Sequence, residues 1–217
     1  MPSIFRKARD PISSYTHILG ALLSAFGLLL MIFRLVTMSS TVVTAVSCIL
    51  FCLSLIALYS ASGFYHFSTS SEKVIKVLRK LDHAMIYVLI AGSYTPVLLK
   101  VLPPPKSYIF TIVIWAVAFS GIIMKLFWIN APRWLTSSLY ILMGWAIVID
   151  FSALVQFDMG AMILLLIGGI CYTVGGVIYA FKWPNFSKSF GFHEFFHIFC
   201  MLGSFFHFIM VFLYVAR

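Results

Sequence analysis

Two histidines near the C-terminus are the side chains of this sequence best suited to chemistry. They bracket the stretch His193-Glu194-Phe195-Phe196-His197. Residues four apart lie on one face of a helix, so both imidazoles can reach a single metal ion. The same five residues match the H-E-x-x-H pattern of zinc hydrolases, in which the glutamate is the general base. This stretch therefore predicts part of a metal centre.

A catalytic zinc ion usually takes three protein ligands and keeps one position for water. His66, which ends an apolar run, supplies a third imidazole for His193 and His197. Neutral imidazoles suit zinc, and the ion lowers the pKa of bound water to about 7. Ser62 lies one helical turn before His66, and Asp82 begins the next apolar run. We predict a zinc site in which Asp82 accepts the proton of the water and Ser62 is a hydrogen-bonding neighbour.

Such a site would hydrolyse an amide or ester, with Asp82 returning the proton to the leaving group. Each residue also has a simpler interpretation. A carboxylate at a helix N-terminus is favoured by about 0.3–1 kcal/mol, which applies to Asp82 and Glu194 alike. Ser62 can serve helix packing alone. Cys200 continues the stripe of His193 and His197 and can close a structural four-ligand site, although a cysteine in an apolar helix usually behaves as a small hydrophobe.

The elements that must position these residues are membrane helices. The chain of 217 residues is 62% hydrophobic and only 10% charged, which is typical of an integral membrane protein. The net charge of +9 does not indicate nucleic-acid binding, because the basic residues lie in short breaks between apolar runs. The four cysteines contain no C-x-x-C pair, which argues against a disulfide framework.

Apolar runs of about 20 residues predict an all-α protein with seven transmembrane helices. We expect one domain covering residues 1–217, with residues 1–15 as a short basic tail. The seven predicted spans lie near residues 16–36, 42–66, 81–102, 107–129, 136–157, 160–181 and 193–216.

The distribution of lysine and arginine predicts the orientation. Eleven of the 15 lie in the N-terminal tail and in or beside the breaks after the second, fourth and sixth spans. Positive charge concentrates on the cytoplasmic side, so we expect a cytoplasmic N-terminus and an external C-terminus in a multi-pass protein of the cell membrane. His66, Asp82, His193 and His197 then lie near the cytoplasmic boundary. His17 is there too, whereas His207 lies ~15 Å deeper than His197 and cannot share the metal.

Three segments resemble the hemolysin-III branch of the PAQR family, which includes the adiponectin receptors. The resemblance covers nearly the whole chain, because the order of the segments and the seven predicted spans agree. The segments are SGFYH at 62–66, LDHAMIYVLIAGSYTP at 81–96, and HEFFHIF at 193–199 followed by Gly203, Ser204 and His207.

The resemblance implies a zinc ion held by His66, His193 and His197, with Ser62 and Asp82 around the bound water. It also implies ceramidase-like hydrolysis of lipid amides, a role in membrane homeostasis, or cytolysis, with a membrane lipid as substrate or ligand. The family pattern assigns no role to the residue at Glu194.

Three hypotheses follow. The leading one is a zinc-dependent membrane hydrolase acting on lipid amides or esters, or a lipid-state sensor that uses the same pocket. The second is a non-enzymatic cytolysin or channel-like protein in which a metal ties two spans together. The third is an intramembrane metalloprotease with Glu194 as its base.

Overall fold

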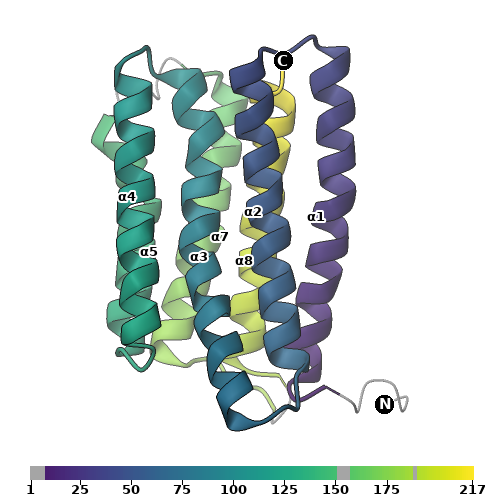
Figure 1. Cartoon of the computed structure of the whole chain (residues 1–217), viewed down its shortest axis with the longest axis vertical. Helices are drawn as coiled ribbons and strands as arrows, with labels where there is room; N and C mark the ends of the chain where they lie inside the picture. Colours follow the sequence, from purple (N-terminus) through teal and green to yellow (C-terminus); the bar gives the residue numbers. More distant parts are fainter. Residues whose placement is uncertain (1–7, 151–156, 188–189) are drawn as a thin grey trace.

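The computed structural model describes residues 8–150, 157–187 and 190–217, and within these ranges every regular element is helical. The helices run antiparallel to their chain neighbours (Figure 1). They are α1 (Pro11–Thr37), α2 (Val42–Phe67), α3 (Glu72–Val101), α4 (Lys106–Phe127), α5 (Arg133–Gly144), the 3₁₀ turn η2 (Ala146–Asp150), α7 (Met159–Phe181), α8 (Phe192–Met210) and the π-helical turn η3 (Val211–Val215).

The helices form two layers. In Figure 1, α1 to α4 stand side by side in front, and α5, α7 and α8 lie behind them. Helix α8 packs against both α7 and α1, so it closes the bundle. We call the end of the bundle where α1, α3, α5 and α8 begin the lower end, as it is drawn in Figure 1.

Six helices within the described residues are long and apolar enough to cross a membrane: Pro11–Thr37, Val42–Phe67, Glu72–Val101, Lys106–Phe127, Met159–Phe181 and Phe192–Val215. Their outward faces carry large apolar side chains, and Leu22 and Phe33 on α1 are 65% and 68% exposed. Exposed apolar surface on this scale is stable against lipid and not against water. The chain is therefore a multi-pass membrane protein.

Helix α3 begins nine residues before the apolar run that predicts its span. It starts at Glu72, with the acidic side chain in the first turn, where it opposes the helix dipole favourably. The segment up to Lys80 is polar but rich in good helix formers, so the helix continues beyond the apolar stretch. Asp82 is consequently well inside α3, and its interpretation as a helix-start residue is wrong.

The fifth predicted span, 136–157, is not one continuous helix. Helix α5 ends at Gly144 and is followed by η2, while residues 151–156 lie outside the described part of the chain. The hydroxyl of Tyr94 on α3 donates to the Gly144 carbonyl at 2.7 Å and accepts from the Ile147 N–H at 2.9 Å. A break in a membrane helix leaves backbone groups that need partners, and Tyr94 supplies one for each side of this break.

Despite the break, α5 and η2 together run the length of the bundle. At the lower end, the buried Lys125 at the end of α4 donates to Thr136 of α5 at 2.8 Å. At the upper end, Asp150 of η2 forms an ion pair with Lys106 at the start of α4. The chain thus crosses from one end to the other between α4 and α7.

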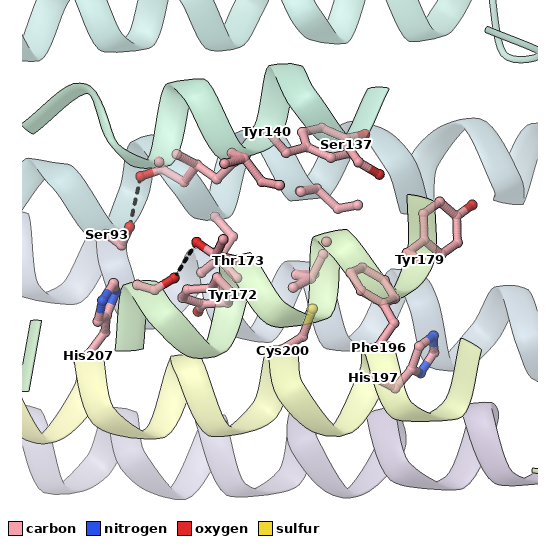
Figure 2. Close-up of a pocket in the computed structure, with 18 of the residues that line it drawn as sticks. Ser93, Ser137, Tyr140, Tyr172, Thr173, Tyr179, Phe196, His197, Cys200 and His207 are labelled. Carbon is pink, nitrogen blue, oxygen red and sulfur yellow. Dashed lines mark hydrogen bonds between the residues drawn. The ribbon is translucent and has the colours of Figure 1, made fainter. Parts of the chain in front are cut away.

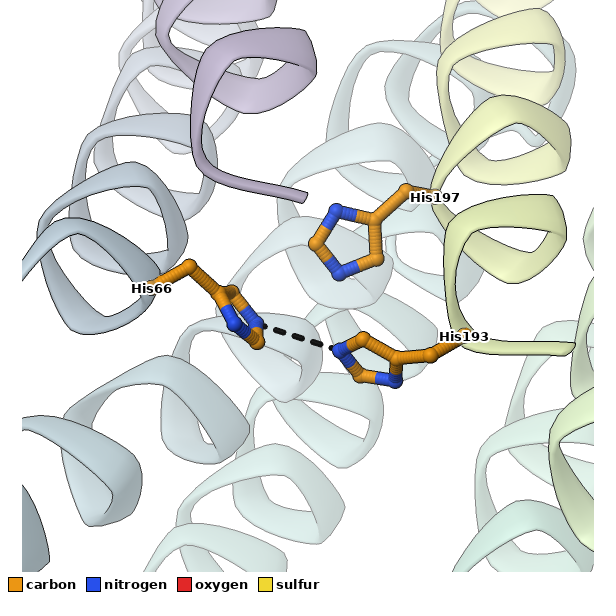
Figure 3. Close-up of side chains that lie close together, drawn as sticks. All are labelled: His66, His193 and His197. Atoms are coloured by element: carbon orange, nitrogen blue, oxygen red, sulfur yellow. Dashed lines mark hydrogen bonds between the residues drawn. The ribbon is translucent and has the colours of Figure 1, made fainter. Parts of the chain in front are cut away.

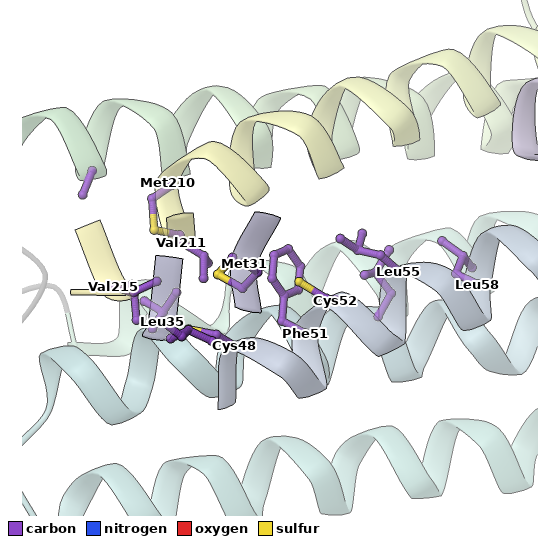
Figure 4. Packing of buried hydrophobic residues seen from close by; sticks show 14 of the residues in the cluster. Met31, Leu35, Cys48, Phe51, Cys52, Leu55, Leu58, Met210, Val211 and Val215 are labelled. Carbon is purple, nitrogen blue, oxygen red and sulfur yellow. The ribbon is translucent and has the colours of Figure 1, made fainter. Parts of the chain in front are cut away.

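The largest apolar core lies in the upper half of the bundle, between α1, α2, α8 and η3 (Figure 4). Met31, Phe51, Cys48 and Cys52 are fully buried there. A second apolar cluster joins α3, α4 and α5 around Tyr87. Outside these two clusters, the buried histidines His17, His66 and His197 of α1, α2 and α8 gather at the lower end.

The packing of α3 on α4 generates a prediction. A methyl group at Gly121 of α4 would lie 2.3 Å from the ring of Tyr87, which is buried, so Gly121→Ala should destabilise the protein by about 1–3 kcal/mol. A methyl group at Gly144 would meet no atom within 4 Å, which makes Gly144→Ala the matched control. Thermal unfolding in detergent measures the stability of both variants. Equal melting temperatures would show that the close contact between Gly121 and Tyr87 does not contribute to the stability of the bundle.

Candidate metal centre

Three imidazoles from two helices meet at the lower end of the bundle (Figure 3). His66 lies in the last turn of α2, and His193 and His197 lie in the first two turns of α8. One ring nitrogen of each lies within 4.8 Å of the others, and Nε2 of His66 is 3.1 Å from Nε2 of His193. His66 and His197 are only 3% and 1% exposed. The structure therefore brings together the three histidines that the sequence places at one depth.

The arrangement fits a metal ion. Nitrogen ligands of a tetrahedral zinc ion, with bonds of about 2.0–2.1 Å, lie about 3.3–3.4 Å apart. The distance of 3.1 Å between Nε2 of His66 and Nε2 of His193 is close to this spacing, and all three ligand nitrogens lie within 4.8 Å of one another. Neutral imidazoles are donors that zinc accepts readily. Within the described residues, this trio is a group that could hold a metal ion.

Asp10 orients the ring of His66. Its Oδ2 lies 2.9 Å from Nδ1 of His66, and its backbone N–H donates to the His66 carbonyl at 3.0 Å. An ionised carboxylate only accepts hydrogen bonds, so Nδ1 carries the proton and the lone pair of the neutral ring is on Nε2. Nε2 is the nitrogen that faces His193. A carboxylate of this kind behind a ligand histidine fixes its tautomer and raises its basicity.

The electrostatics of Asp10 agree with this role. The hydrogen bond from His66, supported by the neighbouring guanidinium of Arg9, holds the pKa of Asp10 below its ordinary value despite the opposing effect of burial. Arg9 itself donates to Asp10 at 3.1 Å and lies over the ring of Tyr65. Sequence reasoning missed Asp10 because it assigned residues 1–15 to the tail, whereas α1 begins at Pro11. An acidic residue beside a helix-starting proline was the available signal.

Glu194 closes the start of α8. Its Oε1 accepts from the Ser13 hydroxyl and its Oε2 from the Gly191 N–H, both at 2.8 Å. Because Oε2 caps the first turn of α8 and Oε1 is bound by α1, the carboxylate is a helix cap that also links α8 to α1. This geometry speaks against the hypothesis of a protease with Glu194 as base. The start of α1 thus holds the ends of both helices that carry the imidazoles.

His17 forms one wall of the site. Its ring stacks on that of His197, with centroids 3.6 Å apart and planes at 17°. It is 3% exposed, and neither ring nitrogen has a hydrogen-bond partner among the described residues. The group of mutually close ligand atoms comprises His66, His193 and His197 and does not include His17. Its contact therefore restrains the orientation of His197.

Asp82 and Ser62 lie beside the imidazoles. Asp82 is 8% exposed, and its Oδ2 lies 3.3 Å from Nδ1 of His83. That nitrogen also lies 2.9 Å from the Arg79 carbonyl, so it carries a proton and donates it there, close to the Asp82 carboxylate. Ser62 lines the same cavity from α2. The Asp82 carboxylate and the Ser62 hydroxyl are therefore the polar neighbours of the candidate metal site.

A cavity of ≈ 140 Å³ connects these residues to the interior of the bundle (Figure 2). Ser62, Asp82, His193 and His197 line it at the lower end, and its walls above them are mainly apolar. Buried Cys200 also lines the cavity, but it does not join the group of ligand atoms found among the described residues. The site is therefore open to an apolar chamber on its inner side.

Comparison with known proteins identifies the family of this chain. A family described as "Haemolysin-III related" matches residues 5–208. The chain is 34% identical over 215 residues to a protein of Bacillus subtilis (strain 168) named "Hemolysin-3 homolog", covering 99% of this chain and 98% of that protein. It is also 34% identical over 204 residues to "Hemolysin-3" of Bacillus cereus, covering 94% and 90%. The resemblance found in the three sequence segments is confirmed, and the chain belongs to the haemolysin-III family of membrane proteins.

Proposed function

We propose that this protein is a zinc-dependent membrane hydrolase that cleaves an amide or ester bond of a lipid. The observation that carries the proposal is that two of the three close imidazoles, those of His193 and His197, line one end of a mainly apolar cavity together with the buried carboxylate of Asp82. An apolar chamber beside polar reacting groups suits a substrate with a hydrocarbon chain. Sensing of lipid state would use the same pocket without turnover.

When bound, the ion would polarise the scissile carbonyl and supply a nucleophile near neutral pH. The remaining chemistry belongs to the chain itself. Asp82 accepts a proton from the attacking water and delivers it to the leaving amine or alcohol. The proton on His83 Nδ1 stabilises the charge of the Asp82 carboxylate, and Ser62 lines the cavity beside it from α2. The apolar walls exclude bulk water, which strengthens these electrostatic interactions.

We further propose seven membrane passes within a single domain, with the N-terminus and the metal site on the cytoplasmic side. The support is that α5 and η2 extend from Lys125 at the lower end to Lys106 at the upper end, which adds a crossing to the six apolar helices. Lysine and arginine also concentrate at the lower end, as expected of cytoplasmic segments. The substrate would then enter from the inner leaflet.

A non-enzymatic role is the alternative, and the names of the relatives, "Hemolysin-3" and "Hemolysin-3 homolog", favour considering it. In that case the ion would only tie α2 to α8. Removing it with a chelator would lower the melting temperature, and no hydrolysis would be lost because none would exist.

The first test separates metal binding from catalysis. Asp82→Asn should keep about one zinc per chain but lose at least roughly 100-fold in turnover, because only the proton acceptor is removed. His197→Ala should lose the zinc itself. Zinc content by elemental analysis and cleavage of a fluorescent fatty-acyl amide in detergent micelles provide the two readouts.

The matched control is Asp158→Asn, which removes a carboxylate at the start of α7 but leaves a residue able to cap the helix. It should change neither readout. Unchanged turnover in Asp82→Asn would remove this residue from the chemistry, and the absence of any cleavage by wild-type protein would favour the non-enzymatic alternative.

A second test concerns Asp10. Asp10→Asn should weaken zinc binding about 10–100-fold, because His66 loses the carboxylate that fixes its tautomer. Competition with a fluorescent zinc chelator measures the affinity without any need for a substrate. Glu72→Gln removes an exposed carboxylate at the start of α3 and should leave the affinity unchanged. Equal affinity in both variants would mean that Asp10 does not support the site.

A further inference from the structure

The cavity has a second polar end that the proposed hydrolysis does not use. His207, Tyr172 and Thr173 line it there. Figure 2 shows His207 and His197 at opposite ends, with Tyr172, Cys200 and Phe196 between them. Ten residues of α8 separate the two histidines, which corresponds to ~15 Å along the helix axis. The chamber therefore has a histidine at each end, and its lining surface is mainly apolar.

The ring of His207 has a defined hydrogen-bonding state. Its Nε2 lies 3.2 Å from the carbonyl oxygen of Leu165 on α7. A carbonyl only accepts, so Nε2 carries the proton, and Nδ1 of the neutral ring is an acceptor. No hydrogen bond from a described residue reaches Nδ1. His207 thus offers an acceptor at the wall of the cavity.

Tyr172 offers the complementary group. Its hydroxyl lies 2.7 Å from Oγ of Ser204, which is also 2.6 Å from the hydroxyl of Tyr59. A phenolic hydroxyl can both donate and accept, so one bond to Ser204 leaves Tyr172 capacity for another partner. Its ring meets the ring of His207 edge to face, with centroids 5.4 Å apart. The two rings therefore lie side by side.

The helix packing is shaped around these two rings. A methyl group at Gly168 of α7 would lie 2.2 Å from Cδ2 of His207, and one at Gly203 of α8 would lie 2.8 Å from the ring of Tyr172. Glycine at both places gives each ring its space. An ionisable side chain inside a membrane helix is costly and usually marks a functional site.

We propose that this end of the cavity is a second polar subsite, which binds a hydroxyl group on the chain of a lipid whose reactive bond lies at the imidazoles. The proposal rests on the lipid hydrolase or sensor function proposed above. The ligand hydroxyl donates to Nδ1 of His207 and accepts from Tyr172, while residues such as Phe196 and Cys200, which lie between the two ends in Figure 2, enclose the chain. The separation of ~15 Å selects hydroxyl groups far from the carbonyl carbon.

The test compares two probes of equal chain length, dodecanoic acid and ω-hydroxydodecanoic acid. Their affinities for the zinc-loaded full-length protein in nanodiscs are measured by isothermal titration calorimetry. Wild-type protein should bind the ω-hydroxy acid roughly three- to tenfold more tightly, as expected for a net hydrogen bond or two. Tyr172→Phe and His207→Gln should each reduce this preference and leave the affinity for dodecanoic acid unchanged.

Tyr108→Phe is the matched control, because it removes a phenolic hydroxyl from an exposed position on α4. It should keep the full preference. Equal binding of the two acids by wild-type protein would overturn the subsite while leaving the lipid cavity intact. A preference that survives both Tyr172→Phe and His207→Gln would overturn it as well, and would reduce His207 to a structural link between α8 and α7. Failure of both acids to bind would overturn the proposed function and the subsite together.

Discussion

The constraint that governs this structure is the lack of water inside a bilayer, which requires every buried polar group to find its partner within the protein. Tyr94 meets this requirement at the break after α5, where it serves backbone groups on both sides. Glu194 meets it at the start of α8. Asp10 meets it for Nδ1 of His66. The same requirement makes a cluster of buried imidazoles costly unless something binds their remaining lone pairs, and a metal ion satisfies several of them at once.

The start of α1 is the element that joins the parts of the site. The backbone and carboxylate of Asp10 hold the end of α2, while the hydroxyl of Ser13 reaches the cap of α8. His17, two turns into α1, stacks on His197. Helices α2 and α8 are far apart in sequence, so their relative position near the imidazoles is set by contacts with α1 as well as by their own packing. The precision of such a site depends on supporting residues of this kind.

Much of this arrangement could be predicted from the sequence. Apolar runs locate the membrane helices, and the basic residues between them indicate which helix ends lie on the same side. That reasoning was sufficient to bring His66, His193 and His197 to one depth. It could not locate the start of α3 at Glu72, since helix propensity continues past the apolar run. It could not foresee the break after Gly144, which depends on a tyrosine from another helix. Asp10 was missed for a similar reason, because its importance arises from a tertiary contact and not from a local pattern.

The number of ligands bears on whether such a site would be structural or catalytic. Structural zinc sites are closed by four protein ligands, whereas catalytic sites use three and keep a position open. Within the described residues the cluster contains three imidazoles, and Cys200, the residue that could have completed a structural set, is not among them. The open side faces a cavity that also contains Asp82 and Ser62. A purely structural site would gain nothing from a buried carboxylate held beside it by His83, since an unused charge in this setting only adds a desolvation cost. The combination supports the proposed hydrolysis over a role in which a metal ion only ties α2 to α8.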